Sequence, residues 1–182
     1  MIIAEIGLSH EGSLGTAHAY IDALASTGVD AIKFQTHIAQ AESSSGEQFR
    51  VPFSKQDKSR MDYWERTSFK KEEWFGLKSH CNDLNLNFFS TPSCLAAVDL
   101  LEKLNVSHYK VGSGDTLNFL LLRRLGETKK PILLSTGMSS YDEIESSIKY
   151  LNKFGNPLTL MQCTSKYPTS PKGWGLDRKS VV

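Results

Sequence analysis

The sequence has few cysteines, no long apolar run and almost no net charge, and each shortage argues against a class of protein. Its three cysteines are far apart in 182 residues, which disfavours a disulfide framework or a cysteine-rich metal site and fits a reducing cytoplasm. No apolar run approaches the ~20 residues that span a bilayer. A formal net charge of +1 without a dense basic cluster predicts neither a nucleic acid nor an acidic membrane as partner.

Two sequence signals are also missing. The first strand-like segment is not followed by the G-x-G-x-x-G turn that marks dinucleotide-binding folds. Met1 to Glu5 enter that segment directly, without a basic n-region or a cleavage site, so we expect a cytoplasmic protein. A composition of 40% hydrophobic and 23% charged residues fits one soluble globular domain with a sizeable core.

What the sequence does contain is a regular alternation of short apolar strands and amphipathic helices. We predict strands at residues 2–7, 30–36, 87–92, 106–111, 131–137 and 158–164, and helices at about 14–25, 70–84, 95–104, 117–125 and 140–151. Strict alternation of this kind predicts a parallel sheet with right-handed crossovers.

Two architectures fit this alternation, a doubly wound open sheet and a (β/α)8 TIM-type barrel. Within the second strand, Ile32 and Phe34 alternate with Lys33 and Gln35, which favours a barrel with the polar pair inside and the apolar pair facing the helices. A complete barrel has eight units and typically ~250 residues. We therefore expect residues 1–182 to form an incomplete barrel of about six βα units, with a smaller open sheet as the alternative.

One segment interrupts the pattern. Residues 37–68 show no clear period and are rich in Ser, Gln, Lys and Arg, with scattered aromatic residues. A loop of this length in a compact domain is usually functional or disordered. The aromatic residues favour an ordered excursion over a linker.

The candidate chemistry begins with two lysines, Lys33 and Lys110, inside apolar strands. An unpaired ammonium group there is costly, so each is expected to face an anion. Three strands end in hydroxyl groups, on Thr91, Ser113 and Ser135. Donors that converge on one face suit a phosphate or a carboxylate. The interpretation is an anionic substrate; the alternative is an internal ion pair, for instance between Lys33 and Glu5.

Other polar residues have less decisive patterns. Glu5 lies within an apolar strand and is either a structural carboxylate or a general base or sugar-hydroxyl acceptor at the barrel mouth. His10 and His37 follow strands, but their spacing does not demand a metal. Cys163 lies in an apolar strand and is interpreted as a core residue.

The chain resembles the sialic acid synthase (N-acetylneuraminate synthase) family. The resemblance is carried by seven segments: Ile3-Ala4-Glu5-Ile6-Gly7, His10-Glu11-Gly12-Ser13, Ile32-Lys33-Phe34-Gln35-Thr36-His37, Phe89-Ser90-Thr91-Pro92, Tyr109-Lys110-Val111-Gly112-Ser113-Gly114-Asp115, Leu134-Ser135-Thr136-Gly137-Met138 and Gln162-Cys163-Thr164-Ser165-Lys166-Tyr167-Pro168. It implies a (β/α)8 barrel followed by an antifreeze-like domain. It also implies condensation of phosphoenolpyruvate with N-acetylmannosamine, or its 6-phosphate, to give N-acetylneuraminate, or its 9-phosphate, and phosphate.

The resemblance also implies roles for individual residues. Phosphoenolpyruvate would be bound by Lys33, Thr91, Lys110, Ser113, Ser135 and Ser165, the sugar would be contacted by Gln35, Asp115 and Tyr167, and Glu5 would be the catalytic carboxylate. A divalent metal, usually manganese, would act as a Lewis acid on the sugar aldehyde.

The departures from the family matter as well. The Ser-Asp-His and Lys-His-Phe-like segments that carry its two metal-binding histidines do not occur in the sequence, so no metal ligand is assigned. The antifreeze-like domain of the homodimeric family is also absent from it. We therefore expect a truncated chain, from a frameshift or premature stop, that is nearly inactive alone. The alternatives are a remnant that binds phosphoenolpyruvate-like anions and a different phosphoenolpyruvate-dependent sugar-acid synthase.

Overall fold

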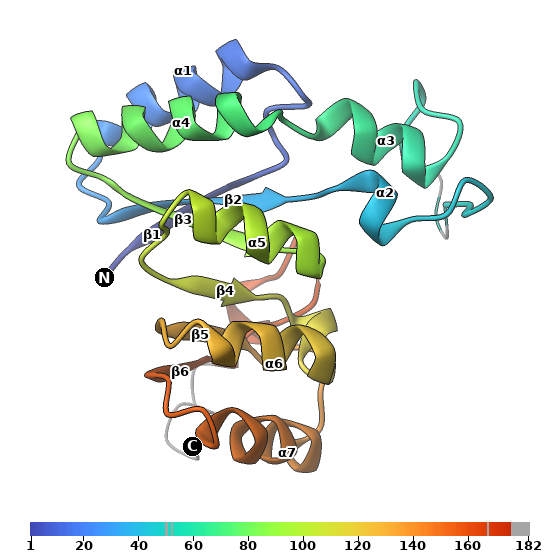
Figure 1. Cartoon of the computed structure of the whole chain (residues 1–182), viewed down its shortest axis with the longest axis vertical. Helices are drawn as coiled ribbons and strands as arrows, with labels where there is room; N and C mark the ends of the chain where they lie inside the picture. Colours follow the sequence, from blue (N-terminus) through green and yellow to red (C-terminus); the bar gives the residue numbers. More distant parts are fainter. Residues whose placement is uncertain (50, 52, 167, 176–182) are drawn as a thin grey trace. The chain divides into compact units, whose positions relative to one another are not determined.

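The computed structural model describes residues 1–49, 51, 53–166 and 168–175. The chain divides into two compact units, Met1–Ser107 and a second that begins at His108. Strands and helices alternate within each unit (Figure 1).

The first unit is built on three parallel strands in the order β1-β2-β3. These are β1 (Ile3–Gly7), β2 (Ala31–Thr36) and β3 (Asn87–Pro92). The helices are α1 (Leu14–Ala25), α2 (Ala39–Glu42), α3 (Arg60–Thr67), α4 (Lys71–Asp83) and α5 (Leu95–Lys103). Helices α1 and α4 lie side by side along the strands (Figure 1).

An aromatic cluster forms the core beneath these helices. Phe34 of β2 stacks on Phe88 of β3, with 5.6 Å between ring centroids, and Trp74 of α4 meets Phe34 edge-on at 5.8 Å. All three side chains are buried. The predicted direction of the apolar residues of the second strand is therefore confirmed: they face the helices.

The turn from β1 to α1 explains the predicted start of the first helix. The Ser13 hydroxyl accepts a hydrogen bond from the Thr16 N–H at 3.2 Å and caps the helix. Gly12 has a φ of +81°, and a Cβ there would lie 2.0 Å from the Arg66 carbonyl oxygen. Only glycine allows the chain before α4 to approach this turn so closely.

The second unit repeats the design with three parallel strands in the order β4-β5-β6. Its elements are β4 (Tyr109–Val111), the 3-10 turn η1 (Ser113–Asp115), α6 (Phe119–Glu127), β5 (Ile132–Ser135), α7 (Tyr141–Asn152), β6 (Leu158–Met161) and the 3-10 turn η2 (Pro171–Gly173). Helices α6 and α7 lie side by side (Figure 1). Ser140 and Glu143 form a capping box at the start of α7, the helix predicted at about residues 140–151.

Two sequence predictions need correction. Strands β4, β5 and β6 are each three residues shorter than predicted, because residues 106–108, 131, 136–137 and 162–164 lie outside the paired ladder. The excursion at residues 37–68 contains α2 and α3, which the sequence pattern did not predict. Helix α3 begins with a capping box from Ser59 and Asp62 rather than with a clear apolar period. Within the described residues, no helix is long and apolar enough to cross a membrane.

Candidate functional site

One face of the first unit's strands carries four polar side chains beside the buried Phe89, and the strand register brings them together. Glu5 of β1 pairs with Lys33 of β2, and Gln35 of β2 pairs with Thr91 of β3. Because residues in register on parallel strands point to the same side, these four side chains share a face. The sequence predicted this face from the alternation in the second strand.

Lys33 is the centre of this polar face. Its Nζ lies 2.8 Å from Glu5 Oε2 and donates to Thr91 Oγ1 at 2.8 Å and to the Phe34 carbonyl at 3.3 Å. The Lys33 side chain is 9% exposed, whereas that of Glu5 is 49% exposed. Burial lowers the pKa of Lys33, and the Glu5 carboxylate opposes that shift. The ion pair considered as the alternative from the sequence is thus present, and the half-exposed carboxylate remains accessible.

Gly7 ends β1 next to these groups. It has a φ of +57°, and the register of β1 against β2 shifts between Glu5 and Gly7. A Cβ on Gly7 would lie 3.1 Å from Glu5 Oε1 and 3.5 Å from Gln35 Nε2. The glycine therefore leaves space in which the carboxylate and the amide both lie.

The two loop histidines have different surroundings. His10 is buried, and its ring lies 4.5 Å from that of Phe69. Burial lowers the pKa of His10 to about 4 despite the nearby Glu11. His37 instead contacts Glu42 at 2.8 Å. Across the part of the chain that the structure describes, no three His, Cys, Asp or Glu side chains gather as a metal site.

A second polar cluster surrounds Lys110 in the second unit. Lys110 Nζ donates to the Ser135 hydroxyl and to the Val111 carbonyl, the latter at 2.9 Å. The Thr116 hydroxyl contacts the carbonyl oxygens of Ser135 and Ser113, each at 3.0 Å. These contacts hold the segments that follow β4 and β5. Ser135 contacts the buried Lys110 directly, and Ser113 is linked to Ser135 through Thr116.

Gly137 joins the remaining members of this Lys110 cluster. Its N–H donates to Ser113 Oγ at 3.1 Å, and a Cβ on it would lie 2.8 Å from Ser165 Oγ. Cys163 Sγ lies 3.2 Å from Ser135 Oγ. The interpretation of Cys163 as a core residue is wrong: the residue is half-buried and belongs to the cluster. The register explains this position, because Ser135 pairs with Met161, two residues before Cys163.

Asp115 and Tyr167 are the other two residues expected at the sugar. Asp115 lies in η1, where its Oδ1 accepts a hydrogen bond from Asn118 Nδ2 at 3.1 Å. Tyr167 lies outside the described residues.

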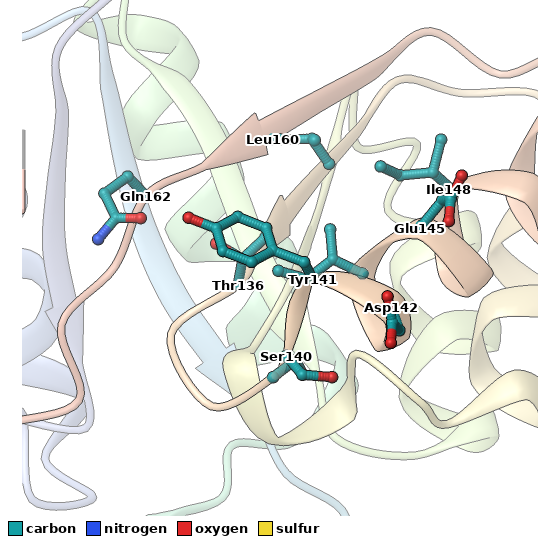
Figure 2. Close-up of a pocket in the computed structure, with 10 residues that line it drawn as sticks. Thr136, Ser140, Tyr141, Asp142, Glu145, Ile148, Leu160 and Gln162 are labelled. Carbon is teal, nitrogen blue, oxygen red and sulfur yellow. The ribbon is translucent and has the colours of Figure 1, made fainter. Parts of the chain in front are cut away.

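A pocket of about 520 Å³ lies in the second unit, between the start of α7 and the end of β6. Figure 2 shows Leu160 and Ile148 pointing toward one another across it, with Tyr141 above Thr136. Leu160 pairs with Leu134, whereas Ser135 pairs with Met161. Because successive strand residues face opposite sides, the pocket lies on the opposite face from the Lys110 cluster. It is a gap beside α7, not the anion site that the sequence predicts.

Comparison with known proteins decides the family. Residues 20–178 match the NeuB family. The chain belongs to the NeuB family. It is 33% identical over its whole length to N-acetylneuraminate-9-phosphate synthase of Drosophila melanogaster, covering 50% of that protein. It is 32% identical to N,N'-diacetyllegionaminic acid synthase of Campylobacter jejuni over 92% of the chain and 52% of the relative. The chain thus spans about half the length of these relatives.

A solved structure supports the same assignment and decides the architecture. The sialic acid synthetase of Leptospira borgpetersenii, crystallised with citrate, superimposes with a TM-score of 0.84 at 28% identity, over 99% of this chain and 59% of the other. Strand pairing inside each unit fits either an open sheet or a barrel. The structural likeness confirms the TIM-type arrangement, which is incomplete in the residues that the structure describes.

Proposed function

We propose that this NeuB chain is the N-terminal part of an enzyme that condenses phosphoenolpyruvate with N-acetylmannosamine or its 6-phosphate. The observation that carries the proposal is the repeated pairing of a buried strand lysine with a strand-end hydroxyl. Lys33 contacts Thr91 in the first unit, and Lys110 contacts Ser135 in the second. An ammonium group beside a hydroxyl donor suits the phosphate and carboxylate groups of phosphoenolpyruvate.

The proposed roles follow from what each residue contacts. On the basis of family resemblance, the proposed phosphoenolpyruvate-binding residues are Lys33, Thr91, Lys110, Ser113, Ser135 and Ser165. Glu5 and Gln35 share the face of Lys33, so we assign the half-exposed Glu5 carboxylate to catalysis and the Gln35 amide to the sugar. Asp115 and Tyr167 are proposed sugar contacts on the basis of family resemblance.

The reaction forms one carbon–carbon bond and one carbon–oxygen bond, from C2 to the oxygen of water, and breaks the carbon–oxygen bond from C2 to phosphate. C3 of phosphoenolpyruvate attacks the aldehyde carbon of the open-chain sugar, water adds to C2, and inorganic phosphate leaves. Glu5 is the group proposed to accept the proton of that water. The products are N-acetylneuraminate, or its 9-phosphate, and phosphate.

The free cysteines Cys81, Cys94 and Cys163 fit the proposed cytoplasmic location.

Manganese is implied by the family resemblance, and the described residues do not fit it. They bring no three His, Cys, Asp or Glu side chains together. We therefore assign no step of the reaction to a metal held by this chain.

The proposal is tested by phosphate release from phosphoenolpyruvate in the presence of the purified chain. Release that requires both N-acetylmannosamine and manganese supports the condensation. Release with arabinose 5-phosphate instead of N-acetylmannosamine supports another sugar-acid synthase. Binding of phosphoenolpyruvate without phosphate release supports the alternative of an anion-binding remnant. Failure to bind phosphoenolpyruvate contradicts both the condensation and the remnant.

A further inference from the structure

His37 lies two residues after Gln35 and is held by the excursion that interrupts the strand–helix pattern. Its ring stacks on that of Trp64 of α3, with 3.9 Å between centroids and 7° between planes. The Ser68 hydroxyl donates to the His37 carbonyl at 3.0 Å. The His37 side chain is buried, with Trp64 against one face of its ring.

One edge of the ring is fixed by a carboxylate of α2. His37 Nδ1 lies 2.8 Å from Glu42 Oε2, and Glu42 Oε1 accepts a hydrogen bond from the Ile38 N–H at 2.7 Å. The Glu42 side chain is 10% exposed. A buried carboxylate needs such partners, so this contact is a directed one, with Nδ1–H as donor.

The other edge of the ring reaches Gln35. His37 Nε2 lies 3.4 Å from Gln35 Oε1 and 3.4 Å from Ser93 Oγ. At its other end, the Gln35 amide places Nε2 against Gly7, where Glu5 Oε1 also lies. The amide oxygen thus faces the histidine, and the amide NH2 faces the side of the catalytic carboxylate.

The ring holds the Gln35 side chain from one side. Glu42 and Trp64 fix the position of the ring, and its Nε2 edge contacts Gln35 Oε1. A side chain that is contacted by a fixed neighbour loses rotamer freedom.

We propose that His37 is a positioning residue for sugar binding. Held by Glu42 and Trp64, it fixes the Gln35 amide so that the NH2 group donates to an oxygen of the sugar beside Glu5. The excursion at residues 37–68 then has a role, because α2 and α3 supply the two groups that hold the ring. The sugar-binding part rests on the proposed function, whereas the orientation of the amide does not.

The orientation is tested by nitrogen-15 spectra of the intact chain, without any activity. At pH 7 we expect a protected Gln35 side-chain amide, assigned from its loss in Gln35→Glu. In His37→Phe, which keeps a ring against Trp64, the Gln35 amide signals should move to the position of an exposed glutamine. Unchanged amide signals in His37→Phe would overturn the proposal.

Two further variants keep this test decisive. Glu42→Gln preserves shape and removes the charge, so it should release the Gln35 amide even if His37→Phe does not fold. Gln40→Ala removes an exposed hydrogen bond to Glu65 in the same excursion and should leave the Gln35 signals in place. Unchanged Gln35 signals in Glu42→Gln would also count against the proposal.

Binding measurements separate this inference from the proposed function. His37→Phe should weaken N-acetylmannosamine binding about tenfold and leave phosphoenolpyruvate binding unchanged. Adding His37→Phe to Gln35→Ala should weaken sugar binding no further. If the wild-type chain fails to bind the sugar while the amide result holds, the proposed function fails and the orientation stands. If His37→Phe binds the sugar normally, the positioning role fails.

Discussion

The two faces of strands β2 and β3 differ in chemistry although both are formed by the same two strands. The face toward α1 and α4 carries Phe34 and Phe88, which pack with Trp74 and are buried. The opposite face carries Lys33, which contacts Thr91 and the half-exposed Glu5. Apolar burial favours folding, whereas burial of an ammonium group opposes it unless partners compensate.

Neighbouring residues of one strand therefore have different roles. Phe34 packs in the core and stabilises the fold, whereas Lys33 and Gln35 on either side of it face the proposed ligand. Substitutions on the two faces should therefore have opposite profiles, one on the free energy of unfolding and the other on binding.

The largest effect is expected on the apolar face. Phe34→Ala should lower the free energy of unfolding by about 3–5 kcal/mol, because a fully buried ring is removed and leaves a cavity. Gln35→Ala, one residue further along, should cost about 1 kcal/mol or less. Urea denaturation of both variants measures this contrast, and equal losses would remove the distinction between the faces.

Acid should lower the free energy of unfolding through His10. The ring of His10 packs against Phe69, and its centroid lies 6.1 Å from that of Phe34. Its pKa is about 4 in the folded chain and ~6.5 when unfolded. Between these values the unfolded chain binds the proton that the folded chain does not. The free energy of unfolding should therefore fall by up to about 3 kcal/mol as pH drops from 6.5 to 4.

The variant His10→Asn isolates this effect. Its side-chain oxygen can still accept the hydrogen bond that His10 Nδ1 accepts from the Gly12 N–H at 3.1 Å. Denaturation curves at pH 7 and pH 4.5 should differ less for the variant than for the wild type. The same pH difference in both proteins would rule out His10 as the cause.

A smaller effect is expected where the polar face ends, at Gly7. Gly7→Ala forces a side chain into the left-handed region and should cost about 1–2 kcal/mol. The new Cβ would also crowd Glu5 Oε1 and the Gln35 amide, so sugar binding should fall as well. Thermal unfolding and sugar titration together check both parts, and a change in only one would show that Gly7 serves only that one.

The smallest effect on stability is expected at the centre of the polar face. Lys33→Met removes a buried ammonium group and the salt bridge to a half-exposed carboxylate, so the free energy of unfolding should change by about 1 kcal/mol or less. A loss as large as that of Phe34→Ala would mean that Lys33 supports the fold rather than a ligand.

The sequence predicted the regular part of this arrangement well. The alternation around Lys33 and Gln35 is a direct consequence of strand geometry, and the capping residues Ser13 and Ser140 are local signals. Strand ends were less predictable, because residues 162–164 continue the strand-like segment of the sequence without a turn signal but lie beyond the paired ladder.

The excursion and its contacts were not predictable from local pattern. The hold on His37 comes from Glu42, five residues later, and from Trp64, which is far away in sequence. Cys163 was misjudged because an apolar neighbourhood says nothing of which face a residue occupies. Such contacts depend on how segments distant in the sequence pack, which neither periodicity nor composition reports.

The most direct test of the central claim is the affinity of the chain for phosphoenolpyruvate, measured by titration calorimetry. The wild-type chain should bind it, and Lys33→Met and Lys110→Met should each weaken binding at least about tenfold. Lys149→Met is the matched control, because that exposed lysine pairs locally with Glu145 on α7 and should leave affinity unchanged. Equal affinity in the wild type and in both strand-lysine variants would contradict the assignment of the polar strand face to this substrate.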